Sequence, residues 1–392
     1  MAATNGIAPP SSNAEAASSR KLRIGLLGLY GMPMQTLQFT GFETGFGEIA
    51  PRLAAAGHDV TMYCRRNSFP ESMRPNEYRG VKLIYVPSPG GKNFSGLLST
   101  FFAVVHALTR GRYDLYCFVN VGMGHHAALC RIFGKKVVMN VDGLDWTRAK
   151  WGPVARKYFL SAAHSAIRFC NALITDAEAM RRFYLERFSK DTTMIAYGAY
   201  VETSKQPELI SQFGIEPNEY YLIASRLVPE NNADLITDAF LRSGSPKKLL
   251  IAGGANYDSP FHRRLREMAG DNVLLAGHIN DVDVIRELHC NCFAYVHGHS
   301  VGGTNPSLLK AMGFGNCILA LDTVFNREAL GDDGVFFPRD ARVLADLMMK
   351  LEGNPRRVAE LRAMGPRRIR QEYTWEKIAS QYEDLFQRVA GT

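Results

Sequence analysis

The stretch Cys292–Gly313, CFAYVHGHSVGGTNPSLLKAMG, contains an apolar run, a glycine-rich turn and a helical pattern, in that order. The run Cys292–Val296 predicts a buried strand, and the residues after the turn predict a helix. A helix that begins after small residues directs several free backbone N–H groups at one point, where its dipole adds partial positive charge. Such a point favours an anion such as a diphosphate, although a Gly-Gly pair before a helix is also a common tight turn.

The segment VGGTNPSLLKAMGFGNCILALD, residues 301–322, resembles the nucleotide-sugar signature of family 4 glycosyltransferases, the retaining enzymes of the GT-B fold. That family usually has two glutamates separated by seven residues, and Gly302 and Lys310 occupy these positions here. The form HGHSVGGTNPS is similar to a narrower bacterial rhamnosyltransferase-like branch, which accounts for Gly302 but not for Lys310. Three further segments resemble the same branch: GFETGFGEIAPRLAAAGHDVTMYCR (41–65), NVDGLDWTRAKWG (140–152) and RLVPENN (226–232).

Bulk properties limit the class of protein before any family is considered. A chain of 392 residues with 46% hydrophobic residues predicts two globular domains. The formal charge of +8 indicates an acidic partner, which charge alone leaves open between a phosphorylated ligand, nucleic acid and an anionic membrane face. Seven cysteines without a CxxC pair indicate reduced thiols and a cytoplasmic protein.

Two segments bear on membranes and export. Residues 1–20 are rich in Ala, Ser, Asn and Pro and lack the apolar core of a secretory signal, so we expect a disordered tail. The longest apolar stretch, Leu97–Leu108, is too short to span a bilayer. Apolar residues from Phe94 to Phe102, with Arg110 and Arg112 nearby, favour peripheral contact with an anionic leaflet. The alternative is that these apolar residues are core and the charges form a solvated face.

Short β-rich runs alternate with helical stretches in both halves of the chain, which predicts an α/β protein with two doubly wound parallel sheets. This is the GT-B architecture of two Rossmann-like domains facing across a cleft. We expect an acceptor domain at 21–200, a nucleotide-sugar domain at 201–373, and a C-terminal helix at 374–392 that, by resemblance, crosses back to the first domain. The expected strands are Leu22–Gly28, Asp59–Cys64, Val81–Val86, Leu115–Val119, Lys136–Val141, Ala172–Thr175, Tyr220–Ser225, Lys248–Gly253, Val273–Leu275, Cys292–Val296 and Cys317–Leu321.

Two places in the first half are candidates for catalysis. The resemblance places Gly41 and Glu43 near the donor phosphates and the acceptor, where Glu43 orients a sugar hydroxyl; the alternative is a first-turn carboxylate favoured by the helix dipole. Asp142 follows an apolar strand and therefore faces the cleft, where a carboxylate binds an acceptor hydroxyl or stabilises positive charge at the anomeric carbon. The alternative is a turn aspartate bonded to its own backbone. Three residues after it are expected on the acceptor side: Asp145, Trp146 and Arg148.

The second half supplies the expected donor site. Arg226 follows the strand YYLIAS, and its planar guanidinium suits a diphosphate. By resemblance, Gly277 and His278 belong to a loop that pairs with the nucleobase edge. The remaining expected donor-binding residues are His299, Gly302, Gly303, Thr304, Asn305 and Lys310.

The sequence shows no metal-ligand spacing, and we expect no metal and no other cofactor. The expected function is retaining, metal-independent hexosyl transfer in cell-surface polysaccharide synthesis. The resemblance implies dTDP-L-rhamnose as donor and a glycan or lipid-diphosphate-linked acceptor at the inner face of the cell membrane, with no nucleic-acid partner. Two alternatives stay open: a family 4 enzyme for another UDP- or GDP-sugar, and an impaired pseudoenzyme or binding subunit, because Lys310 has no acceptor atom for ribose hydroxyls.

Overall fold

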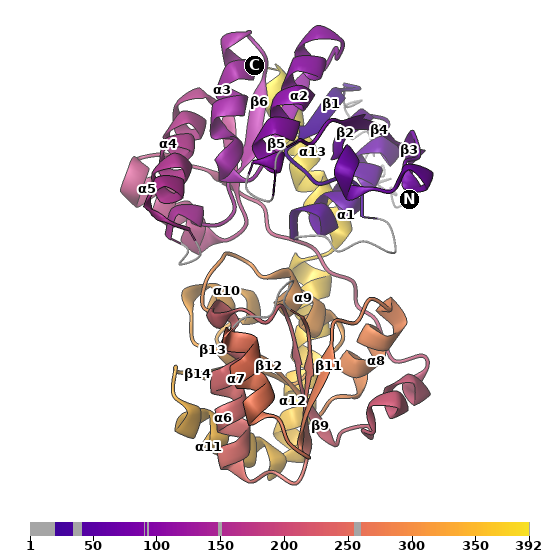
Figure 1. Cartoon of the computed structure of the whole chain (residues 1–392), viewed down its shortest axis with the longest axis vertical. Helices are drawn as coiled ribbons and strands as arrows, with labels where there is room; N and C mark the ends of the chain where they lie inside the picture. Colours follow the sequence, from indigo (N-terminus) through magenta and orange to yellow (C-terminus); the bar gives the residue numbers. More distant parts are fainter. Residues whose placement is uncertain are drawn as a thin grey trace, which may run out of the picture.

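The computed structural model describes residues 20–33, 41–89, 91, 94–147, 151–254 and 260–391. They form two α/β domains, shown one above the other in Figure 1. Helix α1 of the first domain and helices α9 and α10 of the second lie along the edges that face each other. The predicted pair of Rossmann-like domains is confirmed.

The first domain contains a sheet whose strand order is β3-β4-β2-β1-β5-β6-β7-β8, parallel except for the β3–β4 pair. Its central strands are buried apolar runs because helices cover both faces of a doubly wound sheet. In β5, for example, Cys117 belongs to one apolar core and Phe118 to the other. The strands are β1 (Arg23–Leu27), β2 (Asp59–Arg65), β3 (Glu77–Tyr78), β4 (Val81–Val86), β5 (Leu115–Val119), β6 (Val137–Asn140), β7 (Ala172–Thr175) and β8 (Thr193–Met194).

Helices and short 3-10 turns connect these strands. The helices are α1 (Gly41–Ala55), α2 (Ser95–Thr109), α3 (Gly124–Ile132), α4 (Pro153–Phe169) and α5 (Glu178–Phe188). The 3-10 turns of the chain are η1 (Arg66–Ser68), η2 (Glu71–Met73), η3 (Val121–Met123), η4 (Asp145–Thr147), η5 (Pro207–Phe213) and η6 (Pro229–Asn231).

The second domain contains a parallel sheet in the order β11-β10-β9-β12-β13-β14. Its strands are β9 (Tyr220–Ala224), β10 (Lys248–Ala252), β11 (Val273–Gly277), β12 (Ala294–His297), β13 (Ile318–Leu321) and β14 (Val335–Phe337). Its helices, with the two that end the chain, are α6 (Ala233–Ser243), α7 (Pro260–Met268), α8 (Val282–Asn291), α9 (Pro306–Gly313), α10 (Val324–Leu330), α11 (Ala341–Glu352), α12 (Pro355–Glu372) and α13 (Trp375–Gly391).

Three strands have no counterpart in the sequence prediction: β3, β8 and β14. Each lies at the edge of its sheet and is only two or three residues long. Such short segments carry no usable hydrophobic period, because they are extended only by pairing with the neighbouring strand.

The strand order fixes where ligands bind in this type of sheet. The order reverses between β1 and β5 in the first domain and between β9 and β12 in the second. Ligands of doubly wound sheets bind in the crevice beyond the carboxyl ends of the strands at such a reversal. The loops that follow β9 and β12 therefore form the expected ligand site, together with the loops of the first domain that face them.

The C-terminal helix α13 packs against α1 of the first domain, whereas α12 packs against α9 of the second. Figure 1 shows both helices in yellow, one in each domain. Polar contacts accompany the packing: Arg52 with Glu376 at 2.9 Å and His58 with Glu383 at 3.1 Å. In addition, Asn140 donates to the Tyr382 hydroxyl at 3.0 Å, which ties α13 to the end of β6.

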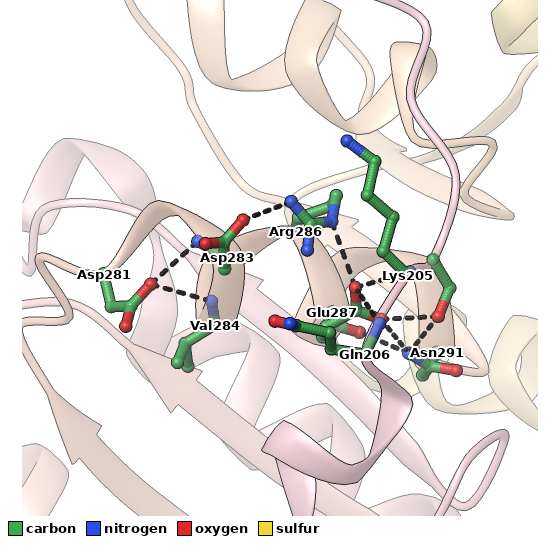
Figure 2. Close-up of polar contacts among 9 residues, drawn as sticks. Lys205, Gln206, Asp281, Asp283, Val284, Arg286, Glu287 and Asn291 are labelled. Carbon is green, nitrogen blue, oxygen red and sulfur yellow. Dashed lines mark hydrogen bonds and ion pairs between the residues drawn. The ribbon is translucent and has the colours of Figure 1, made fainter.

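The segment between the two sheets is anchored on α8 by Glu287, a fully buried carboxylate (Figure 2). It accepts hydrogen bonds from Ser204 Oγ and from the backbone N–H groups of Lys205 and Gln206. Burial alone would raise the pKa of Glu287, but these bonds and that from Arg286 lower it to about 2. The carboxylate therefore stays ionised and holds the segment in place at physiological pH.

The seven cysteines are free thiols, and six of them are buried. Cys290 and Cys292 are not bridged to each other. Within the described residues, no helix combines the length and apolar character needed to cross a membrane.

Candidate active site

The loop after β12 leads into helix α9, which begins at the edge of the second domain that faces the first. Asn305 is the N-cap of this helix and accepts a hydrogen bond from the backbone N–H of Ser307 at 3.0 Å. Pro306 occupies the first helical position, where a missing N–H costs nothing. The remaining N–H groups and the helix dipole give this end partial positive charge.

Two asparagines shape the loop after β9, and one of them joins it to the loop after β12. Asn232 donates to the carbonyl of Gly298 at 2.7 Å, and Asn231 donates to the carbonyl of Arg226 at 2.8 Å. The carbonyl of Glu230 accepts from both the backbone and the side chain of Ser300. A Cβ atom at Gly298 would collide with the carbonyl oxygen of Asn231, so only glycine permits this approach. These asparagines build the crevice and bring no charge to it.

Arg226 is exposed at the end of β9 and lies close enough to His299 to affect its titration. Burial, followed by the charge of Arg226, lowers the pKa of His299 to about 3. The ring of His299 stacks on His297 with centroids 4.2 Å apart, and His297 is fully buried. Both imidazoles are therefore neutral at physiological pH, and Arg226 supplies the positive charge of this corner. A small pocket beside it is lined by His299, Val301, Gly302, Gly303, Asn305, Thr323, Phe325 and Asn326.

Asp142 follows β6 in the first domain and is half-buried. The turn there is made by Asn140, whose side chain accepts from the backbone N–H of Asp142 at 3.0 Å. The Asp142 carboxylate instead accepts from the Tyr197 hydroxyl, with Oδ2 at 3.1 Å. Tyr197, which is distant in sequence, therefore holds the Asp142 carboxylate, while the side chain of Asn140 stabilises the turn.

The N-termini of α1 and α9 meet across the domain boundary beside Asp142. A Cβ atom on Gly41, the first residue of α1, would lie 3.4 Å from Cγ of Pro306 and 3.9 Å from the Tyr197 hydroxyl oxygen. A Cβ on Gly45 would lie 2.9 Å from the Tyr197 ring. The glycines Gly41 and Gly45 therefore leave room for the Tyr197 side chain near the N-termini of α1 and α9. The predicted Gly41, Asp142 and Asn305 are brought together here.

Asp176 is a functional candidate that the sequence analysis missed. It follows β7, is 1% exposed, and lies against Gly303 of the second domain, where a Cβ would collide with Oδ1 of Asp176. Its backbone carbonyl accepts from Thr304 Oγ1 at 2.6 Å. The rule that selected Asp142, a polar residue directly after an apolar strand, would have selected Asp176 as well.

A second contact between the domains lies next to Asp176. Helix α5 has no side-chain cap of its own, since Ala177 is its N-cap. Glu328 of α10 accepts from the backbone N–H groups of Glu178 at 2.6 Å and Ala179 at 3.1 Å. A carboxylate of the second domain therefore caps a helix of the first.

Glu43, Asp145 and Trp146, the other predicted residues of the first domain that the structure describes, make local contacts within that domain. The carboxylate of Glu43 is buried and accepts from the Tyr30 backbone N–H at 2.8 Å. Asp145 is buried and accepts from Asn120 at 3.3 Å. The Trp146 ring packs against aromatic rings of α5, which commits most of its surface to packing. Arg148 lies outside the described residues. The assigned roles stay predictions.

Three predicted donor-side residues lie away from the α9 N-terminus. Gly277 ends β11, and His278 contacts Gly254 at the end of β10 and hydrogen-bonds Asn280 at 2.9 Å. Lys310 is reached by solvent, yet surrounding protein lowers its pKa, against the raising effect of Glu202. Its ammonium lies 5.7 Å from the Phe314 ring centre.

Comparison with known families agrees with this geometry. A glycosyl transferase 4-like domain model matches residues 40–198, and a glycosyl transferases group 1 model matches residues 205–368. The two matches cover more than four fifths of the chain and divide it between the two sheets. The chain is a GT4-type glycosyltransferase. The narrower rhamnosyltransferase branch is not distinguished by these matches.

Solved structures share the GT-B fold of this glycosyltransferase. Sucrose-phosphate synthase from Thermosynechococcus elongatus is 19% identical with a TM-score of 0.77, covering 94% of this chain and 99% of that one. Anabaena HepE in complex with UDP-glucose is 16% identical with a TM-score of 0.74, covering 93% and 99%. A glycosyltransferase from Rickettsia africae is 12% identical with a TM-score of 0.73, covering 94% and 98%. No protein of curated function matches the sequence.

Proposed function

We propose that this glycosyltransferase is a retaining, metal-independent enzyme that transfers rhamnose from dTDP-L-rhamnose to a lipid-diphosphate-linked glycan. The observation that carries the proposal is the meeting of Asp142, Tyr197 and the N-terminus of α9 across the domain boundary. A diphosphate at the α9 N-terminus brings the attached sugar beside a carboxylate of the other domain. This is the arrangement that a positively charged sugar transition state requires.

The proposed donor site has two sources of positive charge: the α9 N-terminus and Arg226. These groups neutralise the diphosphate without a metal ion. In the proposed mechanism the departing phosphate accepts the proton of the acceptor hydroxyl, and the acceptor attacks from the side that the phosphate leaves. The nucleotide base would lie toward Gly277 and His278, two strands away from β9.

The proposal of rhamnose as the sugar and thymidine as the nucleoside rests on the resemblance of four sequence segments and on Lys310. Lysine cannot accept hydrogen bonds from ribose hydroxyls, and a deoxyribose donor has one hydroxyl fewer to lose. The alternative is a UDP-sugar, which the shared fold with HepE, solved with UDP-glucose, supports.

One experiment tests the reaction. Purified protein is incubated with dTDP-rhamnose, UDP-glucose or GDP-mannose and a lipid-linked glycan acceptor, in the presence of EDTA, and nucleoside diphosphate release and product are measured. Transfer of rhamnose with retained anomeric configuration is the expected result. Transfer only from another donor selects the alternative, and binding without transfer or hydrolysis identifies an impaired protein.

Arg226→Ala is expected to weaken nucleoside diphosphate binding by about 1.5–3 kcal/mol, the usual contribution of a charge-assisted hydrogen bond. Calorimetry with dTDP and UDP measures the change. Arg242→Ala is the matched control, because Arg242 is an exposed arginine of the same domain that pairs with Asp238 at 2.9 Å. Equal affinities for the wild type and a folded Arg226→Ala protein would remove Arg226 from the site.

An anionic membrane is the proposed location of the acceptor. Helix α2 buries Ala103, Val104 and Ala107, so one face of the helix belongs to the core. The opposite face is exposed and apolar, and Arg110 follows it: Leu98, Phe101, Phe102 and Val105 recur at helical spacing. Such a face, with basic residues beside it, suits an anionic leaflet.

Replacing Phe101 and Phe102 by serine is expected to weaken binding to anionic vesicles by about tenfold or more, because each buried aromatic contributes ~1.5–3 kcal/mol. Co-sedimentation with phosphatidylglycerol vesicles measures it, with phosphatidylcholine vesicles for comparison. Leu241→Ser, at an exposed position of the second domain, is the control. Equal sedimentation of both variants would exclude α2 as the membrane face.

A further inference from the structure

Asp176 has an environment that suits a protonated carboxyl group. Asp176 is 1% exposed, and among the described residues its carboxyl oxygens meet no hydrogen-bond donor other than its own backbone N–H. The one side chain within hydrogen-bonding reach is Asp142, another acid. If both acids were ionised, neither could donate a hydrogen bond to the other, and an uncompensated buried charge is costly.

The groups that act on Asp176 offer no positive charge to offset an ionised form. Asp142 approaches from the loop after β6, and Glu328 approaches from α10, so both charged neighbours are acidic. The Tyr197 hydroxyl donates its hydrogen bond to Asp142, and the Tyr382 hydroxyl accepts one from Asn140. Burial first, then the charge of Asp142, raises the pKa of Asp176 well above its ordinary value.

The two acids differ in their access to water. Asp142 is half-buried at the cleft, whereas Asp176 is covered by Gly303 and Thr304 of the second domain. A single negative charge on the pair is therefore most stable on Asp142, with the proton on Asp176. The Asp142 carboxylate then receives two donors, the carboxyl group of Asp176 and the hydroxyl of Tyr197.

We propose that Asp176 is a positioning residue that carries a proton and donates it in a hydrogen bond to Asp142, which holds the Asp142 carboxylate toward the cleft. Two donors make Asp142 a weak base, so it acts as an oriented negative charge and leaves proton transfer to the departing phosphate. This role rests on the proposed function of Asp142, but the protonation of Asp176 does not.

The kinetic test compares Asp176→Asn with Asp176→Leu across pH. The amide N–H₂ of asparagine keeps a donor for Asp142 and cannot ionise, whereas leucine has a similar size and no donor. Wild-type kcat is expected to fall as pH rises through the raised pKa of Asp176, where the carboxyl group loses its proton. Asp176→Asn should lose that fall and keep more turnover than Asp176→Leu at neutral pH. An asparagine variant whose kcat falls with rising pH as in the wild type, or one no more active than the leucine variant, overturns the proposal.

A second test needs no catalytic activity. A carboxyl group with a raised folded pKa stabilises the fold at low pH and loses this contribution as pH rises from its ordinary value of 3.8 to the raised one. Across that window the folding constant of the wild type should fall by about tenfold per pH unit relative to Asp176→Asn. Urea unfolding measures this ratio at each pH.

Infrared difference spectra identify the proton directly. The wild type at neutral pH should show the carbonyl stretch of a protonated carboxyl group, which Asp176→Asn should lack. Absence of this band, together with parallel stability curves for the two proteins, overturns the proposal even if transfer is observed. If no sugar is transferred, these two measurements still decide whether Asp176 is protonated. A failure of the proposed reaction can therefore be distinguished from a failure of the proposed role of Asp176.

Discussion

Replacing Asp142 with asparagine is expected to reduce kcat by about 10²–10³-fold while the fold and donor affinity stay close to wild type. The substitution removes a charge and preserves shape, and Tyr197 still has an acceptor at that position. The loss falls on turnover because the charge acts on the developing positive charge of the sugar, as with other preorganised electrostatic groups. Single-turnover rates with saturating donor measure the effect.

Tyr197→Phe is the companion variant, since it keeps the carboxylate and removes one group that orients it. Its kcat is expected to fall by about tenfold, the effect of one lost hydrogen bond. Calorimetry with the nucleoside diphosphate confirms that both variants keep the donor site. An Asp142→Asn rate within a few-fold of the wild type would show that Asp142 is a structural turn residue.

Gly303→Ala is expected to abolish transfer almost completely while the second domain keeps its affinity for nucleoside diphosphate. A methyl group at Gly303 would occupy the position of Oδ1 of Asp176. The carboxyl group is short and buried, so it has little room to withdraw, and the two domains must separate locally. Separation withdraws the α9 N-terminus from Asp142 and should leave Arg226 and α9 intact.

Gly270→Ala is the matched control for Gly303→Ala. Gly270 is a glycine of the same domain, and a methyl group there would meet no atom within 4 Å. Transfer rates and dTDP affinities of both variants are compared with those of the wild type. Full activity of Gly303→Ala would mean that the Asp176–Gly303 contact is dispensable for the reaction.

The fold class followed from local pattern alone. The alternation of apolar strands with helices defined two doubly wound sheets because each strand, covered on both faces, must be a continuous apolar run. The edge strands β3, β8 and β14 were not predictable, since two or three extended residues have no period of their own. The start of α9, with its partial positive charge, was also encoded locally, because Asn305 caps the helix and Pro306 occupies its first position.

The candidate catalytic centre was decided by tertiary structure. Asp142, Asp176 and Tyr197 are separated in sequence, and they meet because β6, β7 and β8 are adjacent in one sheet and end at one edge. The sequence by itself therefore determined the two domains and the positive helix end. Only the tertiary structure placed Gly303 on Asp176 and Glu328 on the bare N-terminus of α5, because these contacts join residues of different domains whose approach no local pattern encodes.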